Sequence, residues 1–275
     1  MNRDTFFATA KKHSVEEQAK IIWELRQPAI QIDLTKVASD DEVPVGASKF
    51  GGLPDLPPGT DYPYHYEQAL VFVCQLNCAD LKRFDGINLL PETGLLSFFF
   101  NDYIYRDEGW YDTTNWRVWY FEDVVELQRL EVSPAIEVYD VARTSFEVKQ
   151  TIPQLWSYIP DSLRPKMDRE TEDMYLEFEY EILPDKNDHC MYGHPNEVQG
   201  GLFAETELFA QGGSYSLPQV MEQRLLDTWR LLLQVDSVYD LDMIWGDAGR
   251  LYYCIREDDL KARAFDRAVC TAQGS

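Results

Sequence analysis

The stretch L231-L-L-Q-V-D236 is the best starting point, because F72-V-C-Q-L-N77 shows the same pattern in the first half of the chain. In each stretch an apolar run ends in Gln, followed by an apolar residue and then Asn or Asp. Short apolar runs with aromatic or branched neighbours are typical of buried β-strands. The pattern therefore predicts two equivalent strands, with Gln75 and Gln234 at the same position in each.

The segments around these two strands also correspond. A loop rich in Gly and Pro comes before each strand: S48-K-F-G-G-L-P54 in the first case and G193-H-P-N-E-V-Q-G-G201 in the second. A glycine turn follows each strand, L90-P-E-T-G94 or W245-G-D-A-G249, and leads into an aromatic run. Because Gly and Pro interrupt helices and strands, the sequence predicts the same order of stiff loop, strand, turn and strand in both halves.

This repeated order predicts two similar halves that pack about a pseudo-twofold. We expect mainly antiparallel sheets in two related, pseudo-symmetric halves, about 28–130 and 131–275, with an N-terminal helix and a few short helices. The space between two such halves is a natural place for a pocket.

The N-terminal helix is expected over residues 14–27. Ser14 and Glu17 form an S-x-x-E capping box, and Pro28 is expected to end the helix. Apolar residues then recur at helical spacing, at Ala19, Ile22 and Leu25.

The other elements follow from periodicity and turn signals. Alternating or apolar runs predict strands over 29–35, 70–76, 95–100, 116–121, 135–141, 174–183, 229–236, 251–255 and 267–273. Helices are expected from the capping signature of Ser216, Pro218 and Gln219 to about Asp227, and over 257–262. Loops are expected over 48–59 and 101–112.

The predicted strand 174–183 alternates apolar and acidic residues, which places Glu177, Glu179 and Glu181 on one exposed face. Such a row, together with Asp107 and Glu108 in the acidic loop, is suited to gripping a basic partner. Like charges on an exposed strand also discourage edge-to-edge aggregation, so the row has a purely structural interpretation as well.

The charge of the whole chain limits the classes of partner. The formal net charge is −23 and the pI is about 4.4. Nucleic acids and anionic membrane surfaces would be repelled, so neither is expected as a partner. A basic protein partner is compatible with this charge, and so is a surface that only keeps the chain soluble.

The composition favours a soluble chain in the cytoplasm. The 275 residues are 45% hydrophobic, enough for a substantial core, yet no apolar run is long enough to span a membrane. The first residues lack the apolar core of a secretion signal. Of the five cysteines, Cys74 and Cys254 lie in apolar runs, so we expect reduced cysteines without disulfides.

Motifs of known catalytic or cofactor chemistry are missing from the sequence. It contains no G-x-S-x-G elbow, P-loop, EF-hand loop or H-E-x-x-H pattern. His194 with Asp247 would suit a base and its orienting acid, but a His between Gly and Pro more often fixes a loop. His189, Cys190 and His194 lie close in sequence without a recognised ligand spacing. We therefore predict no catalytic residue, no metal site and no cofactor.

Seven motifs follow one another along the chain: S48-K-F-G-G-L-P54, C74-Q-L-N77, L90-P-E-T-G-L-L-S-F-F99, G193-H-P-N-E-V-Q-G200, L232-L-Q-V-D-S237, W245-G-D-A-G-R-L-Y-Y253 and D259-L-K-A-R-A-F-D266. Together they resemble one known family, the YwqG-like family of bacterial cytosolic proteins, over about residues 29–273. The resemblance implies a single α+β domain, residues 1–275, of two related halves. It brings no reaction with it; some relatives look like parts of toxin and immunity neighbourhoods, which is compatible with an inhibitory binding role.

The candidate recognition surface is made of the loops and the strand ends. Glycines allow close approach of a ligand to the main chain, Gln both donates and accepts hydrogen bonds, and Trp offers a flat apolar face. The glutamines are equally suited to satisfying the buried main chain of these loops. The candidate binding residues are Gly51, Gly52, Gln75, His194, Gln199, Gln234, Trp245 and Asp247.

The sequence thus predicts a non-enzymatic, acidic, cytosolic binding protein, an inhibitory or immunity-type partner of a basic protein. The alternative is a small-ligand binder or an enzyme that uses a cleft between the two halves near His194, Gln75 and Gln234. The oligomeric state is left open.

Overall fold

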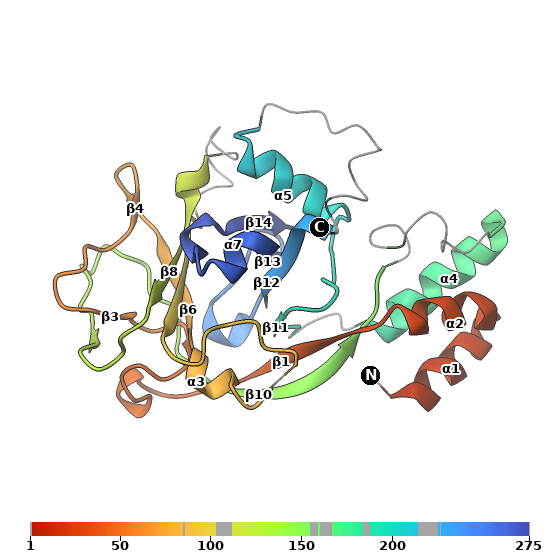
Figure 1. The fold of residues 1–275 in the computed structure, drawn as a ribbon, viewed down its shortest axis with the longest axis horizontal. Helices are drawn as coiled ribbons and strands as arrows, with labels where there is room; N and C mark the ends of the chain where they lie inside the picture. Colours follow the sequence, from red (N-terminus) through yellow and green to blue (C-terminus); the bar gives the residue numbers. More distant parts are fainter. Residues whose placement is uncertain are drawn as a thin grey trace.

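A computed structural model describes residues 2–84, 86–102, 112–154, 159, 167–183, 188–213, 225 and 227–274 (Figure 1). Most of the chain forms one ten-stranded sheet in the order β14-β13-β12-β11-β1-β10-β2-β6-β7-β8, with antiparallel pairing. Its strands are β1 (Gln27–Lys36), β2 (Lys49–Phe50), β6 (Val71–Asn77), β7 (Leu95–Phe100), β8 (Trp116–Phe121), β10 (Ala142–Thr151), β11 (Cys190–Met191), β12 (Trp229–Asp236), β13 (Arg250–Arg256) and β14 (Val269–Gln273).

The long strands β1 and β10 form the middle of the sheet. They pair from Gln27 opposite Thr151 to Lys36 opposite Ala142. Strands β2, β6, β7 and β8 continue the sheet from β10 and are called the first wing. Strands β11, β12, β13 and β14 continue it from β1 and are called the second wing.

The two wings fold towards each other and make the sheet barrel-like and nearly closed. The Tyr253 hydroxyl donates to the carbonyl of Phe99 at 3.2 Å, and the Tyr253 ring lies 5.0 Å from the ring of Phe98. The Trp116 indole donates to the carbonyl of Ala268 at 2.8 Å. The main apolar core, which includes Phe98, Trp245 and Tyr253, draws on both wings.

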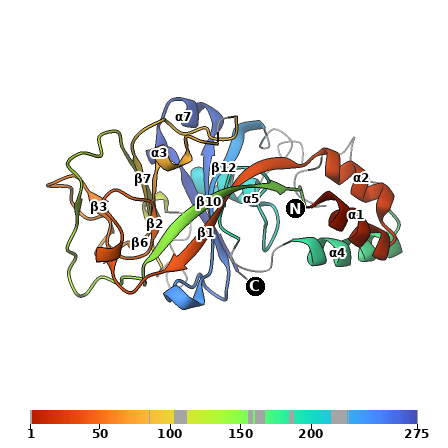
Figure 2. The ribbon, with the colours of Figure 1, turned by 90° about the horizontal axis from the view of Figure 1, so that it is seen from below.

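Three helices form a separate unit at one end of the molecule, as Figure 2 shows: α1 (Arg3–Lys12), α2 (Glu16–Glu24) and α4 (Arg169–Ile182). Phe6, Trp23, Tyr175 and Phe178 share an apolar core of their own there. The short elements elsewhere are η1 (Asp40–Glu42), β3 (Asp55–Leu56), β4 (Tyr64–His65), β5 (Gln68–Ala69), α3 (Cys78–Leu81), η3 (Thr113–Asn115), β9 (Gln128–Arg129), α5 (Leu202–Ala210), η4 (Tyr239–Leu241), α7 (Glu257–Lys261) and η5 (Phe265–Arg267).

The predicted helix 14–27 is wrong in its boundaries. Ser14 lies in the turn between α1 and α2 with φ 58°, and the N-cap of α2 is Val15, which makes no side-chain capping bond. Val15 is fully buried, so apolar packing and not a capping box fixes this start. Pro28 lies within β1, since α2 already ends at Glu24.

The predicted strand 174–183 is also wrong, because these residues belong to helix α4. The Asp168 carboxylate caps this helix by accepting from the Thr171 N–H at 2.9 Å. Glu179 turns inward and is only 8% exposed, whereas Glu177 and Glu181 remain exposed. The expected row of three glutamates on one face therefore does not exist.

The predicted strand 135–141 is wrong as well, because the strand begins at Ala142 as β10. The other predicted strands match β1, β6, β7, β8, β12, β13 and β14 to within a few residues, and the helix over 257–262 matches α7. Most of the helix expected before Asp227, and both Asp107 and Glu108, lie outside the described residues.

These elements confirm an α+β fold that is mainly antiparallel. All five cysteines are buried and free. Among the helices of the described segments, none is long and apolar enough to cross a membrane.

Candidate functional site

Gln75 is completely buried in β6, and its side chain binds both ends of the segment from Ala47 to Asp55. Its Oε1 accepts from the Asp55 N–H at 2.9 Å, and its Nε2 donates to the carbonyl of Ala47 at 2.8 Å. Nε2 also donates to the Asp55 carboxylate at 2.6 Å. These bonds occupy both ends of the amide.

Gln234 is equally buried in β12 and holds the corresponding loop of the second wing. Its Oε1 accepts from the Asn196 N–H at 2.9 Å, and its Nε2 donates to the carbonyl of Asp188 at 2.6 Å. Each glutamine thus satisfies main-chain groups at both ends of an irregular loop, the role that such loops require of a buried side chain.

Gly51 and Gly52 are needed for close approach within the chain itself. Their φ angles are 61° and 68°, in the left-handed region that favours glycine. A Cβ at Gly51 would overlap the carbonyl of Asp140, and one at Gly52 would overlap the Asp40 carboxylate.

Trp245 is also a core residue. It is fully buried, its indole donates to the carbonyl of Asp236 at 3.3 Å, and its ring meets Phe100 and Tyr139 edge-on at 5.9 and 5.7 Å. Asp247 is exposed on the following turn.

Gln199 is exposed and lies beside Gly274, the last described residue. Its Nε2 donates to the carbonyl of Gly274 at 2.5 Å, and its N–H donates to the Gln273 side chain at 3.1 Å. The structure therefore distributes the predicted binding residues over both wings and does not bring them together around one cavity.

Of the predicted binding residues, His194 lines a cavity. Its N–H donates to Thr151 Oγ1 at 2.8 Å, and its Nε2 lies 2.8 Å from the carbonyl of Leu25. Burial lowers the pKa of His194 to about 4, despite the bond to that carbonyl. The ring is therefore uncharged at neutral pH, and Nε2 carries the proton because a carbonyl can only accept. His194 thus ties its loop to the end of α2.

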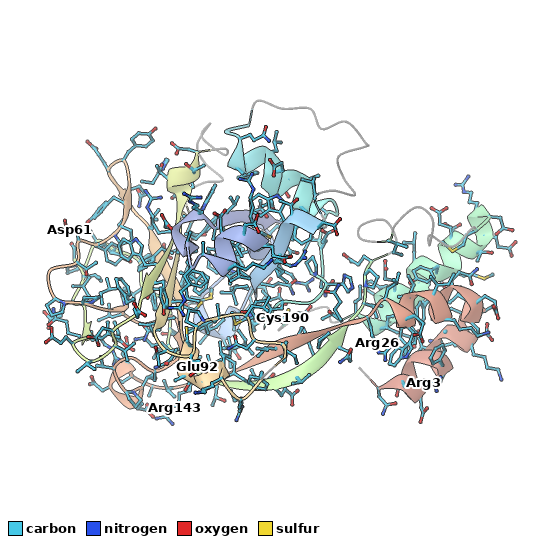
Figure 3. All side chains as sticks on the ribbon, viewed as in Figure 1. Arg3, Arg26, Asp61, Glu92, Arg143 and Cys190 are labelled. Carbon is cyan, nitrogen blue, oxygen red and sulfur yellow. The ribbon has the colours of Figure 1, made fainter. Side chains whose placement is uncertain are left out.

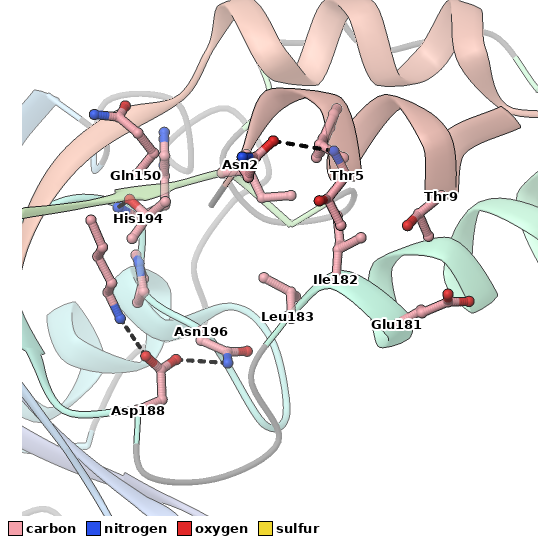
Figure 4. A pocket seen from close by; sticks show the side chains of 15 residues that line it. Asn2, Thr5, Thr9, Gln150, Glu181, Ile182, Leu183, Asp188, His194 and Asn196 are labelled. Carbon is pink, nitrogen blue, oxygen red and sulfur yellow. Dashed lines mark hydrogen bonds and ion pairs between the residues drawn. The ribbon is translucent and has the colours of Figure 1, made fainter. Parts of the chain in front are cut away.

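The cavity beside His194 has a volume of about 390 Å³ and lies between the helical unit and the sheet (Figure 4). One wall is apolar, with Phe6, Ile152, Ile182, Leu183 and Pro195. Lys149, Asp188, His194 and Asn196 form one polar end, and further polar side chains of the lining come from the N-cap and first turns of α1 and from α4, at Asn2, Thr5, Thr9 and Glu181.

An ion pair forms the polar end of this cavity. The Lys149 ammonium binds the Asp188 carboxylate, and Asn196 Nδ2 donates to the same carboxylate at 2.8 Å. Burial alone would raise the pKa of Asp188, but Lys149, Asn196 and Arg250 outweigh it and the pKa is lowered. Burial likewise opposes the charge on Lys149, yet Cys190 and Asp188 raise the pKa of its ammonium. Both groups stay ionised, so this end donates and accepts hydrogen bonds without net charge.

Sequence reasoning missed Lys149, Asp188 and Asn196. The correspondence that singles out two of them appears only in the structure, where Asp188 and Asn196 hold the same places around Gln234 that Ala47 and Asp55 hold around Gln75.

A larger cavity of about 510 Å³ lies on the other side of the His194 loop. His194 and Pro195 line both cavities, so this loop separates them. The larger cavity is mainly apolar, with Leu25, Leu89, Tyr192, Phe203 and Trp229 among its walls.

His189, Cys190 (labelled in Figure 3) and His194 are close in sequence but make separate contacts in the structure. His189 Nδ1 accepts from the Asp236 N–H, and His194 binds Leu25. Within the described ranges, three or more His, Cys, Asp or Glu side chains never converge in a way that could hold a metal.

The exposed face of α4 is a second candidate surface. Of its charged residues, six are acidic and only Arg169 is basic. Tyr180 is 83% exposed and Leu176 is 40% exposed on the same helix. The exposed acidic residues recur at i, i+3, i+7 and i+11 and so form one stripe along the helix, at Glu170, Asp173, Glu177 and Glu181.

Among the described residues, the basic side chains that contact this stripe do so at its C-terminal end. Lys12 binds Glu181 at 2.6 Å, and the His13 ring lies 2.7 Å from the same carboxylate and 3.6 Å from Glu177. The bonds from Lys12 and His13 lower the pKa of Glu181.

Comparison with known families gives one match. A family model described as "Domain of unknown function (DUF1963)" matches residues 48–274. The match begins just before β2 and extends into the last described residues, so it covers both wings and α4 but not α1, α2 or β1. No curated protein matches the chain at a significant level.

Proposed function

We propose that this chain, which belongs to the DUF1963 family, is a non-enzymatic protein that binds a basic protein partner through the exposed face of α4. The observation that carries the proposal is the acidic stripe beside two exposed apolar side chains, Leu176 and Tyr180. A cationic segment with apolar residues on one side complements such a face in both charge and polarity.

The stripe destabilises helix α4, and this supports the assignment of α4 as a binding face. Glu177 and Glu181 are four residues apart, as are Asp173 and Glu177, and like charges at this spacing destabilise a helix. Glu179 and Glu181 also lie in the last turn, where the helix dipole favours cations, and this turn has no basic residue. Lys12 and His13 offset this repulsion at the C-terminal end of the stripe, whereas a cationic partner would relieve it along the whole stripe.

The net charge of −23 supports the same proposal through kinetics, because a strongly acidic surface speeds the approach of a cationic partner. We further propose that the partner is held in an inhibitory or immunity-type complex in the cytoplasm, a role that is compatible with the resemblance to YwqG-like proteins.

A charge-neutralising variant of α4 tests the proposal. The variant Glu170→Gln, Asp173→Asn, Glu177→Gln keeps the contact between Lys12 and Glu181. Its binding to a synthetic amphipathic helical peptide of lysine and leucine is measured by calorimetry at low and high salt. We expect affinity to fall about tenfold in the variant and to fall with salt in the native chain.

The matched control removes the same charge from exposed residues elsewhere, with Glu126→Gln, Glu131→Gln and Glu137→Gln. This control should bind the peptide nearly as well as the native chain. Equal losses in the two variants would mean that only net charge matters, and α4 would then not be the binding face.

We also propose that the two wings are related halves arranged about a pseudo-twofold. The matching bonds of Gln75 and Gln234 support this, and so do the irregularities in strand register between Phe72 and Cys74 in β6 and between Leu231 and Leu233 in β12. A crystal structure tests the proposal by superposition of the wings. A best fit that places Gln75 away from Gln234 contradicts it.

A second candidate function is the binding of a small amphipathic molecule in the 390 Å³ cavity, which pairs an apolar wall with the buried ion pair of Lys149 and Asp188. The variant Thr5→Trp places a large ring at the mouth of this cavity, and Ala8→Trp is a control on the same helix outside the lining. With octanoate as the probe, thermal stabilisation should disappear in Thr5→Trp and persist in Ala8→Trp. Equal stabilisation in both variants rules out this cavity.

A further inference from the structure

His189 is a buried residue whose protonation state the structure determines. Its side chain is almost fully buried, and Nδ1 accepts from the Asp236 N–H at 3.1 Å. Burial lowers the pKa of His189 to about 3, in spite of the nearby Asp188. Because the ring is neutral and Nδ1 is an acceptor, the single proton lies on Nε2.

The Nε2–H of His189 has no acceptor among the residues that the structure describes. A buried donor left without a partner costs about 1–3 kcal/mol, so native proteins rarely keep one without a reason.

The first wing shows what an acceptor at this place looks like. Ser48 precedes β2 as His189 precedes β11, and Ser48 Oγ accepts from the Asn77 N–H at 2.8 Å, as His189 accepts from Asp236. The Ser48 hydroxyl then donates to the Asp80 carboxylate at 2.6 Å. The first wing therefore supplies its own acceptor, and the second wing leaves the donor open.

His189 lines a cavity of about 280 Å³ between β1 and the segment that follows β12. The base of this cavity is apolar and buried, with Ile32, Ala142 and Leu241, and half-buried Leu34 and Val238 continue its walls.

The mouth of the cavity is charged. It carries exposed Asp33, Lys36 and Asp240. The Lys36 ammonium donates to the Asp140 carboxylate at 2.6 Å and to the carbonyl of Asp240 at 2.5 Å, so this cation is already engaged. The hydrogen bond that Lys36 donates to Asp140 raises the pKa of Lys36, and the charges of Asp140, Asp240 and Asp242 act in the same direction. The mouth therefore has an excess of negative charge.

We propose that this cavity is a binding site for a small uncharged carbonyl compound, an amide or a ketone, whose oxygen accepts the Nε2–H of His189. The open donor requires an acceptor atom, and the apolar base requires an apolar body. The acidic mouth repels anions, and the apolar base, where the only polar atom of the described residues aimed at a ligand is a donor, offers a cation no counter-charge. The volume is close to the lower limit of ordinary ligand pockets, which restricts the ligand to a small molecule.

Titration with ε-caprolactam, a cyclic amide with an apolar ring, tests this site by NMR of the protein labelled with ¹⁵N-histidine. We expect a saturable shift of the His189 Nε2–H resonance and no comparable shift at His194. The variant His189→Asn keeps an oxygen that can accept from the Asp236 N–H but lacks the Nε2 donor. It should remain folded in thermal melts and lose caprolactam binding.

A second pair of variants leaves His189 unchanged. Leu34→Trp fills the wall of the cavity and should weaken binding at least tenfold. Phe146→Trp makes the matching change in the cavity beside Ser48 and should leave binding unaltered. An unchanged His189 resonance at saturating probe overturns the proposal, as does equal binding by both tryptophan variants. A crystal structure with caprolactam in which only a water meets Nε2 overturns it too.

Discussion

Lowering the pH from 7 to 5 should destabilise this protein markedly, through His189 and His194. Burial lowers the pKa of His194 to about 4 and that of His189 to about 3, whereas an unfolded histidine titrates near 6.5. Because the folded pKa values lie below the unfolded one, the unfolded chain binds more protons as the pH falls. Stability is therefore fully present above pH 6.5 and is lost progressively below it.

The size of the effect follows from these values. Between pH 7 and pH 5, protonation of one unfolded histidine that stays neutral when folded costs about 2 kcal/mol of unfolding free energy. The two rings act on different loops, one on Asp236 and the other on Leu25, so their effects should add to about 4 kcal/mol.

Urea denaturation at pH 5, 6 and 7 measures this loss directly, and two variants assign it. His194→Gln keeps a donor for the carbonyl of Leu25, and His189→Asn keeps an acceptor for the Asp236 N–H. Each variant should show about half of the native pH dependence, because each removes one of the two titrating rings.

Acidic groups do not produce the same signature. The lowered pKa of Asp188 removes stability only near and below the unfolded value of about 3.9, under the tested window. Burial raises the pKa of Glu205, which acts in the opposite direction and is the same in all variants. The reasoning is refuted if both variants keep the full native pH dependence, or if NMR shows either ring titrating near pH 6.5.

Two further predictions concern the stiff loops. Gln234→Leu leaves the Asn196 N–H and the carbonyl of Asp188 without their buried partner, so urea denaturation should show a loss of about 2–5 kcal/mol. Gly51→Ala should prevent folding or lower the melting temperature strongly, because its Cβ would overlap a main-chain carbonyl, whereas Gly201→Ala, with φ 67° and no atom near its Cβ, should cost only about 1 kcal/mol; similar melting temperatures for the two alanine variants would contradict this.

The strands were predictable because their signals are local. Apolar runs bounded by glycine turns, such as 95–100 and 251–255, remain strands wherever the sheet places them. The matched positions of Gln75 and Gln234 were also visible in sequence, although which atoms the amides bind was not. That choice depends on how two irregular loops fold back over their strands.

Helix α4 was missed because its sequence fits two periods. Leu176, Phe178, Tyr180 and Ile182 alternate with glutamates as in a half-buried strand. Tyr175, Phe178 and Ile182 also recur at helical spacing, and it is these residues that pack in the core shared with α1 and α2. Contacts far apart in sequence therefore decided the outcome, and local alternation alone was not sufficient.

The ion pair of Lys149 and Asp188 depends on the position of β1 in the sheet. Strand β1 lies between β10, which carries Lys149, and β11, which follows Asp188, so the pair spans an intervening strand. The β1 residue opposite Lys149 is Ala29, a small side chain that leaves room for the long lysine chain to cross. Nothing in the segments around 149 and 188 encodes this neighbour, because strand order is a long-range property of the whole sheet. The polar end of the cavity is thus a consequence of topology, while the acidic stripe of α4 follows from the residues of one helix once that helix is recognised.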